Sequence, residues 1–172
     1  ILKAVTTAKE QSPVLPYNLL KLQSDASRKF GIKSHEVKDI TQSLREKHKL
    51  ITYNRSDCEY LNDEHHIDAP DVLEAIKNTA TIFGNVINKA DIKIKSRAFN
   101  SSKVSAHHAI IPTTNTANFE SLTDKEQKIY MLIARAYIAQ FFPKMMYDET
   151  EIITECKGFQ FITTSRVIKS LG

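Results

Sequence analysis

The chain has 172 residues, of which 41% are hydrophobic and 26% are charged, with four glycines and five prolines. This composition is typical of a folded domain and excludes a disordered, collagen-like or fibrous chain. The net charge of +4 allows contact with a polyanion, but it is too small to specify one.

The two cysteines, Cys58 and Cys156, are too few and too far apart for a disulfide framework or a zinc ribbon, and they favour a reducing compartment. No stretch reaches the roughly 18 apolar residues that a membrane span needs, and the first residues lack the apolar core of a signal peptide. We therefore expect a cytoplasmic protein with no membrane partner. Because the chain opens on Ile1 and closes just after a strand-like apolar run, we also expect it to be a piece of a longer protein.

The first part of the chain predicts a strand and then two helices. ILKAVTTAKE alternates as a strand does, and prolines 13 and 16 then break it into a linker. Apolar residues at helical spacing predict a helix over 17–30 that Gly31 ends. Ser34 is expected to cap a second helix, so that the pair is similar to a helix-turn-helix. In the second helix Val37, Ile40 and Leu44 are predicted to face inward, and Lys38, Arg45, Lys47 and Lys49 outward.

Residues 50–56, LITYNRS, alternate β-branched and aromatic residues and are too few for a stable helix, so the segment is predicted to be extended. On an extended backbone Thr52 and Asn54 face one way, and Tyr53 and Arg55 face the other.

The second half predicts two further helices and a hairpin. A helix is expected from Asp68 to about Phe83, followed by a basic surface loop over 88–105. A capping-box pattern at Thr123 and Glu126 precedes a largely buried helix that Pro143 ends. Two period-two segments then flank a turn at Lys157 and Gly158. The fold class predicted is therefore mainly α with a small β component (α+β), a helical domain carried on strands at both ends.

Tyr53 and Arg55 are the first candidates for chemistry. Because they project to one side of an extended segment, the guanidinium can hold an oxyanion against which the phenol oxygen reacts. A phenol is a weak nucleophile near neutral pH, so cationic neighbours must stabilise the developing charge. The structural alternative is a half-buried strand tyrosine beside a surface arginine.

The second candidate is the pair His107 and His108 in SAHHAIIPT. Adjacent side chains on an extended chain point to opposite sides, so one histidine is placed to act, for instance by donating to a phosphate oxygen, and the other to pack. A purely structural pair is the alternative. The acids and histidines of NDEHHID, residues 62–68, have no recognised metal spacing and are interpreted as a solvated helix start.

Four blocks, LPYNLLKLQSDASRKFG, LITYNRSDCEYL, SAHHAIIPT and KIYMLIARAYIAQFFP, resemble in order and approximate spacing the central part of type IA DNA topoisomerases. The resemblance spans nearly the whole chain and is highly specific. His108 and Ile111 are similar to the topoisomerase III branch, whereas Asn54 departs from the proline common at that place.

The resemblance implies that Tyr53 attacks a single-strand DNA phosphodiester and becomes linked to the 5′ phosphate, followed by strand passage and religation without ATP. It implies that Arg55 contacts the scissile phosphate and that His107 is the histidine of the AHxxI segment. Arg55, His107, Lys49 and Lys103 are the predicted DNA-binding residues. In the family a Toprim domain supplies the acids that bind Mg²⁺, and no such pattern is present here. The fragment alone is therefore expected to be inactive in cleavage.

The resemblance also implies a division into domains. Residues 1–15 and 146–172 are expected to be pieces of domain II, and residues 16–145 the tyrosine-bearing domain III with a winged-helix-like core related to CAP. The partners expected are single-stranded DNA of a nucleoid or plasmid and the remaining domains of the polypeptide (Toprim, II and IV). Two alternatives from other classes remain open: a noncatalytic winged-helix-like nucleic-acid-binding module, and a helical interaction domain.

Overall fold

The structure is a computed structural model that describes residues 1–172. The chain forms two compact units, one of residues 1–13 with 142–172 and the other of residues 14–141. The first unit is a sheet and the second contains all the helices. The predicted α+β class is confirmed.

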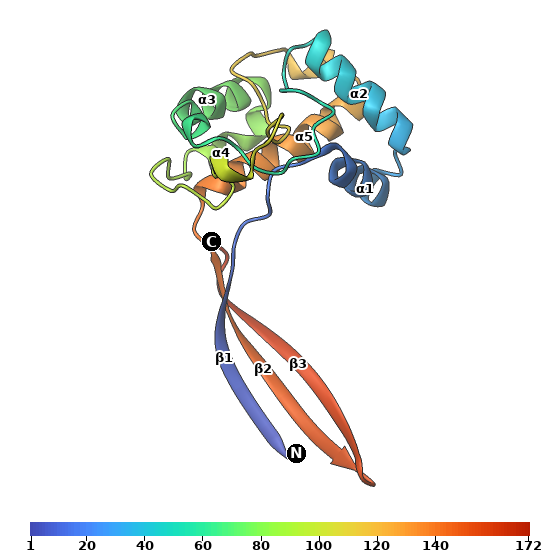
Figure 1. Cartoon of the computed structure of the whole chain (residues 1–172), viewed down its shortest axis with the longest axis vertical. Helices are drawn as coiled ribbons and strands as arrows, with labels where there is room; N and C mark the ends of the chain where they lie inside the picture. Colours follow the sequence, from blue (N-terminus) through green and yellow to red (C-terminus); the bar gives the residue numbers. More distant parts are fainter. The chain divides into compact units, whose positions relative to one another are not determined.

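The sheet unit consists of three antiparallel strands, β1 (Lys3–Gln11), β2 (Met145–Cys156) and β3 (Phe159–Ser170), with β2 in the middle (Figure 1). The turn between β2 and β3 places Lys157 at a φ of 52° and Gly158 at a φ of 83°. Two consecutive positive φ values match the twist of a two-residue hairpin, which explains the glycine here. The predicted hairpin is confirmed.

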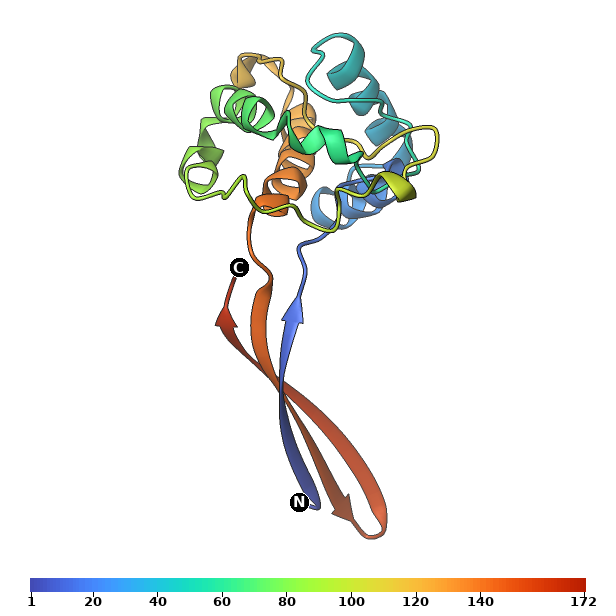
Figure 2. The ribbon, with the colours of Figure 1, turned by 60° about the vertical axis from the view of Figure 1, so that its left-hand side comes forward.

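The helical unit contains α1 (Leu19–Phe30), α2 (Ser34–Glu46), α3 (Ala69–Thr79), α4 (Gly84–Ile87) and α5 (Asp124–Ile138). In Figures 1 and 2, α5 runs through the middle of this unit, with α1 and α2 to one side and α3 and α4 to the other. Short 3-10 turns, at 63–66, 81–83, 101–103, 119–121 and 139–141, connect or extend the helices.

The ends of α1 and α5 follow from local sequence. The side chain of Asn18 accepts a hydrogen bond from the Lys21 amide at 2.8 Å, and Gly31 ends α1 in the left-handed region at a φ of 67°. At α5 the Glu126 carboxylate accepts from the Thr123 amide at 2.8 Å, while Thr123 Oγ1 accepts from the Glu126 amide at 3.3 Å. The predicted end of α1 at Gly31 and the predicted start of α5 at Thr123 are confirmed, because each depends on residues within one turn of the helix. The start of α1 lies at Leu19 and not at residue 17.

Other boundaries differ from the prediction. Lys33 rather than Ser34 precedes α2, and its amide donates to the Glu36 carboxylate at 3.0 Å. Helix α3 stops at Thr79, and a 3-10 turn at Thr81–Phe83 leads into α4, so the predicted continuous helix to Phe83 is wrong. Likewise α5 gives way to a 3-10 turn at residues 139–141 before Pro143 is reached.

The core of the helical unit is built around α5, where Ile129, Tyr130, Ile133 and Tyr137 are fully or almost fully buried. Helices α1 and α2 contribute residues such as Leu22 and Leu44, each with no exposed surface. The Ser43 hydroxyl donates to the buried Glu126 carboxylate at 2.7 Å and joins α2 to the start of α5. No helix has the length and apolar character that crossing a membrane requires.

Candidate active site

Backbone pairing brings the Tyr53 segment beside the histidine segment. Ile51 forms an antiparallel bridge with Pro112, and the Thr52 amide donates to the Ile111 carbonyl at 3.0 Å. The Ile111 amide in turn donates to Thr52 Oγ1 at 3.1 Å. Ile51 and Ile111 are both buried, which holds this pairing in register. Tyr53, two residues after Ile51, then lies beside His107, four residues before Ile111.

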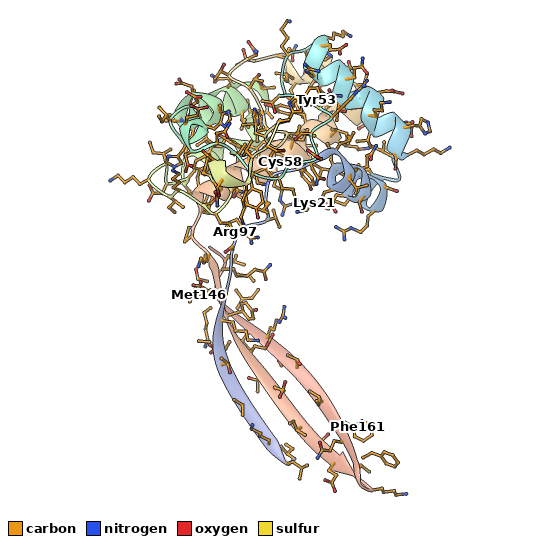
Figure 3. All side chains as sticks on the ribbon, in the orientation of Figure 1. Lys21, Tyr53, Cys58, Arg97, Met146 and Phe161 are labelled. Atoms are coloured by element: carbon orange, nitrogen blue, oxygen red, sulfur yellow. The ribbon has the colours of Figure 1, made fainter.

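The Tyr53 ring contacts two other side chains, one of which, His107, was predicted from the sequence. Its centroid lies 4.1 Å from that of His107, with the two ring planes inclined by 31°. The guanidinium carbon of Arg45, on α2, lies 4.8 Å from the same centroid. Tyr53 lies on the helical unit (Figure 3). Tyr53 and Arg45 are half-buried and His107 is exposed, so the group is open to solvent at His107.

Helix α2 also holds the two residues after Tyr53. The buried Asn54 donates its amide to Thr41 Oγ1 at 3.2 Å, and the exposed Arg55 donates to Gln42 Oε1 at 3.3 Å. The backbone turns at Asn54 and Arg55 to make these contacts, so the prediction of an extended segment through Ser56 is wrong beyond Tyr53. The turn replaces strand alternation because Asn54 finds its hydrogen-bond partner on α2 and not on a neighbouring strand.

Arg45 was predicted to face outward and instead covers the Tyr53 ring. Sequence reasoning thus missed the contribution of α2 to this group, namely Thr41, Gln42 and Arg45. Thr41 and Gln42 lie four and three residues before Arg45 on the same helix, and that spacing is the only signal the sequence carries for them. It cannot be recognised without knowing that the segment after Ile51 folds back onto α2.

The adjacent histidine, His108, has a different environment. It is half-buried, its ring lies 4.3 Å from that of His65, and its Nδ1 donates to the Ala109 carbonyl at 2.8 Å. Burial lowers the pKa of His108; the hydrogen bond to Ala109 opposes this shift, whereas the neighbouring His65 and His107 add to it. The two histidines therefore differ as alternation predicts, with His107 toward Tyr53 and His108 packed away from it.

The two lysines named from the sequence do not join this group. Lys49 is exposed and holds a φ of 57°, and its carbonyl accepts from Thr113 Oγ1 at 2.6 Å. Lys103 lies over the Tyr60 ring at 4.6 Å and donates to the Tyr60 hydroxyl at 3.3 Å. Neither forms a hydrogen bond, ion pair or cation–π contact with Tyr53, Arg55 or His107.

The basic loop over 88–105 is largely exposed, as predicted, but one of its charges is neutralised. Lys95 pairs with Asp63, and this ion pair, together with hydrogen bonds from Ser101, lowers the pKa of the Asp63 carboxyl to about 2. Asp63 belongs to the NDEHHID segment, whose residues 63–66 form a 3-10 turn. No cluster of three or more His, Cys, Asp or Glu side chains is placed to hold a metal ion.

The arrangement places the Tyr53 phenol against the imidazole of His107 and the guanidinium of Arg45, and Gln42 of α2 holds the guanidinium of Arg55. None of Arg45, Arg55 and His107 forms an ion pair with a carboxylate. Of these three, Arg55 and His107 are exposed and can bind an oxyanion beside the tyrosine.

The family comparison decides what this chain is. A protein-family model described as DNA topoisomerase matches residues 1–172. This chain belongs to the DNA topoisomerase family. The predicted resemblance to that family is confirmed.

Several relatives are named DNA topoisomerase 3. That of Vibrio cholerae serotype O1 is 47% identical over 163 residues, which are 95% of this chain and 25% of the relative. That of Haemophilus influenzae is 42% identical over 164 residues, again 95% of this chain and 25% of the relative. That of Bacillus subtilis is 38% identical over 168 residues, 97% of this chain and 23% of the relative. The chain thus spans about a quarter of the length of the curated relatives it matches.

A solved structure shares the fold of this topoisomerase chain. Full-length topoisomerase I from Thermotoga maritima matches with a TM-score of 0.64 over 98% of this chain and 27% of that one, at 24% sequence identity. At this identity the likeness establishes the arrangement of helices and strands and not the roles of individual residues.

Proposed function

We propose that this chain is the tyrosine-bearing part of a type IA DNA topoisomerase that cuts and rejoins one strand of DNA. The observation that supports it best is the contact of the Tyr53 ring with both His107 and Arg45. Tyr53 also lies two residues before Arg55 in the chain. A binding module that only holds phosphate has no need of a phenol fixed among cations. The noncatalytic alternative is therefore less well supported.

In the proposed reaction the Tyr53 oxygen loses its proton and bonds to phosphorus, while the bond from phosphorus to the 3′ oxygen breaks. The 3′ oxygen takes up a proton and becomes a free hydroxyl, and the 5′ phosphate stays on Tyr53. Religation is the reverse exchange, in which the 3′ hydroxyl attacks and the phenol leaves. One phosphodiester is replaced by another at each step, so the bond energy is kept and ATP is not consumed.

Arg55 and His107 are proposed to act on the phosphate itself. Arg55 is exposed and Gln42 holds it by a single hydrogen bond, so most of its donors are free for the scissile phosphate. His107, in its protonated form, can donate to a nonbridging oxygen from its place against the Tyr53 ring. Fixed donors of this kind stabilise the charge that develops in the transition state.

Mg²⁺ is proposed as a cofactor of the whole enzyme and not of this chain. The residues present do not fit a metal site, because no cluster of acids, histidines or cysteines is placed to form one. We assign the metal to a Toprim domain elsewhere in the protein, and we expect the 172-residue chain to lack cleavage activity by itself.

We propose that the compact unit of residues 14–141 corresponds to domain III, expected over 16–145. The unit of residues 1–13 with 142–172 would then correspond to the pieces of domain II, expected over 1–15 and 146–172. Helices α1 and α2, joined at Gly31–Lys33, would form the helix-turn-helix of a winged-helix-like core. We further propose that the enzyme is cytoplasmic, works on single-stranded DNA, and acts together with the remaining domains of its polypeptide.

The direction of the covalent link tests this function. The intact enzyme that contains this chain is incubated with single-stranded oligonucleotide carrying a label at either its 5′ or its 3′ end, with Mg²⁺, and then denatured. A 5′-phosphotyrosine retains the 3′-labelled piece on the protein and releases the 5′-labelled piece. Label on the protein from the 5′-labelled strand, or from neither strand, would contradict the proposal.

A further inference from the structure

Arg45 covers the nucleophile proposed above without being part of the phosphate-binding group. We propose that Arg45 is a positioning residue for Tyr53: its guanidinium holds the ring and stabilises the negative charge that the ring takes on during cleavage and religation. This inference rests on the proposed function, because it assigns Arg45 a part in the same reaction.

The position of Arg45 is set by α2 and not by a flexible loop. The guanidinium carbon lies 4.8 Å from the Tyr53 centroid, within the range at which a cation interacts with an aromatic ring. Arg45 follows the fully buried Leu44 on α2, and Val37 on the same helix is also fully buried. With the helix anchored in the core, the length of the arginine side chain determines where the charge sits.

The charge of Arg45 is available to the ring. Arg45 is half-buried and forms no salt bridge and no hydrogen bond through its side chain. A carboxylate next to a guanidinium would neutralise most of its effect on a third group. Here the Tyr53 ring is the partner that the structure gives this cation, and partial burial weakens the screening by water.

The chemistry makes this contact stronger in the transition state than in the resting enzyme. A neutral phenol attracts a cation only through the quadrupole of its ring, whereas a phenol that is losing its proton carries net negative charge on the oxygen and ring. Only interactions that strengthen in the transition state accelerate the chemical step. In religation the same oxygen leaves phosphorus with the same partial charge, so both directions benefit equally.

The test uses three variants of the intact enzyme. Arg45→Met keeps the length and apolar stem and removes the charge, Arg45→Lys keeps a charge without the planar group, and Lys38→Met removes an exposed charge from the same helix as a control. Single-turnover cleavage and religation are measured at saturating single-stranded oligonucleotide, with noncovalent affinity measured separately. Thermal unfolding of each variant checks its folding, and Arg45→Gln replaces Arg45→Met should the latter not fold.

The expected result is that Arg45→Met slows cleavage and religation together by about 2- to 30-fold, the factor to which cation–π energies correspond. Arg45→Lys should recover part of the rate, and Lys38→Met should cleave at the wild-type rate. Affinity for DNA should fall no further in Arg45→Met than in Lys38→Met.

Two results would overturn the inference. The first is a wild-type rate in the folded Arg45→Met enzyme. The second is equal rates in Arg45→Lys and Arg45→Met, which would show that the contact contributes packing and no charge. A wild-type enzyme that forms no adduct at Tyr53 would refute the proposed function itself and the inference with it. An adduct at Tyr53 with rates that do not respond to Arg45 would refute the inference alone.

Discussion

The hydrogen bond between Asn54 and Thr41 fixes the turn that carries Tyr53 and Arg55, and its removal has a predictable cost. In Thr41→Val the side chain keeps its shape and loses its hydroxyl, so the amide of Asn54 becomes a buried donor without its acceptor. Such a group costs about 1–3 kcal/mol. Unfolding a domain of about 130 residues carries an entropy near 0.27 kcal/mol/K, so the unfolding midpoint should fall by about 4–11 °C.

The assay is thermal unfolding of the 172-residue chain followed by circular dichroism. Thr114→Val is the matched control, because Thr114 is exposed, and its change in stability should stay within about 0.5 kcal/mol. The Thr41 hydroxyl also donates to the Lys38 carbonyl at 2.9 Å, a bond within its own helix that contributes little beside the buried amide. A midpoint for Thr41→Val that matches Thr114→Val would refute the view that this hydrogen bond holds the turn.

Three further results are expected. Arg55→Ala and His107→Ala should each slow cleavage in the intact enzyme by about 100- to 1,000-fold without unfolding it, and Arg55→Lys should recover part of the loss, as measured by single-turnover cleavage. Burial raises the pKa of Glu126, but hydrogen bonds from Ser43 and Thr123 outweigh burial and hold this pKa below its usual range. The ionised Glu126 therefore contributes stability above about pH 4.5, and this stability is lost as the pH falls through the folded-state pKa. Glu126→Gln should flatten this acid limb of the profile of unfolding free energy against pH. The 172-residue chain should bind single-stranded oligonucleotide without forming an adduct, with a log–log salt slope of about −0.7 per neutralised phosphate in an anisotropy titration; no binding at low salt would contradict the placement of its basic residues beside DNA.

The sequence predicted those parts of the fold that depend on neighbours in the chain. Gly31 ends α1, Thr123 with Glu126 starts α5, and Lys157 with Gly158 makes the hairpin turn, because each signal acts within a few residues. The break between α3 and α4 was not predicted, because apolar residues at helical spacing continue past Thr79. The backbone leaves the helical region at Ala80, which has a φ of −122° and a ψ of 84°.

The candidate site was also predictable only in part. Tyr53, Arg55 and His107 could be named from their residue types and the family resemblance, and the structure places Tyr53 against His107. The contribution of α2 could not be predicted, because a charged residue on a helix is ordinarily solvated, and Arg45 was predicted on that basis to face outward. The contact of Arg45 with the Tyr53 ring depends on the pairing of Ile51 with Pro112, which joins residues 61 positions apart in the chain.

The proposed role of Tyr53 is tested most directly by asking which residue becomes linked to the DNA. The intact enzyme and its Tyr53→Phe variant, which lacks one oxygen on a half-buried ring, are incubated with 3′-labelled single-stranded oligonucleotide and Mg²⁺, denatured, and digested for identification of the labelled peptide. We expect an adduct on the Tyr53 peptide of the wild type and none with the Phe variant, whose folding and noncovalent DNA binding stay close to wild type. A denaturation-resistant adduct with Tyr53→Phe, or a wild-type adduct on another residue, would contradict this role.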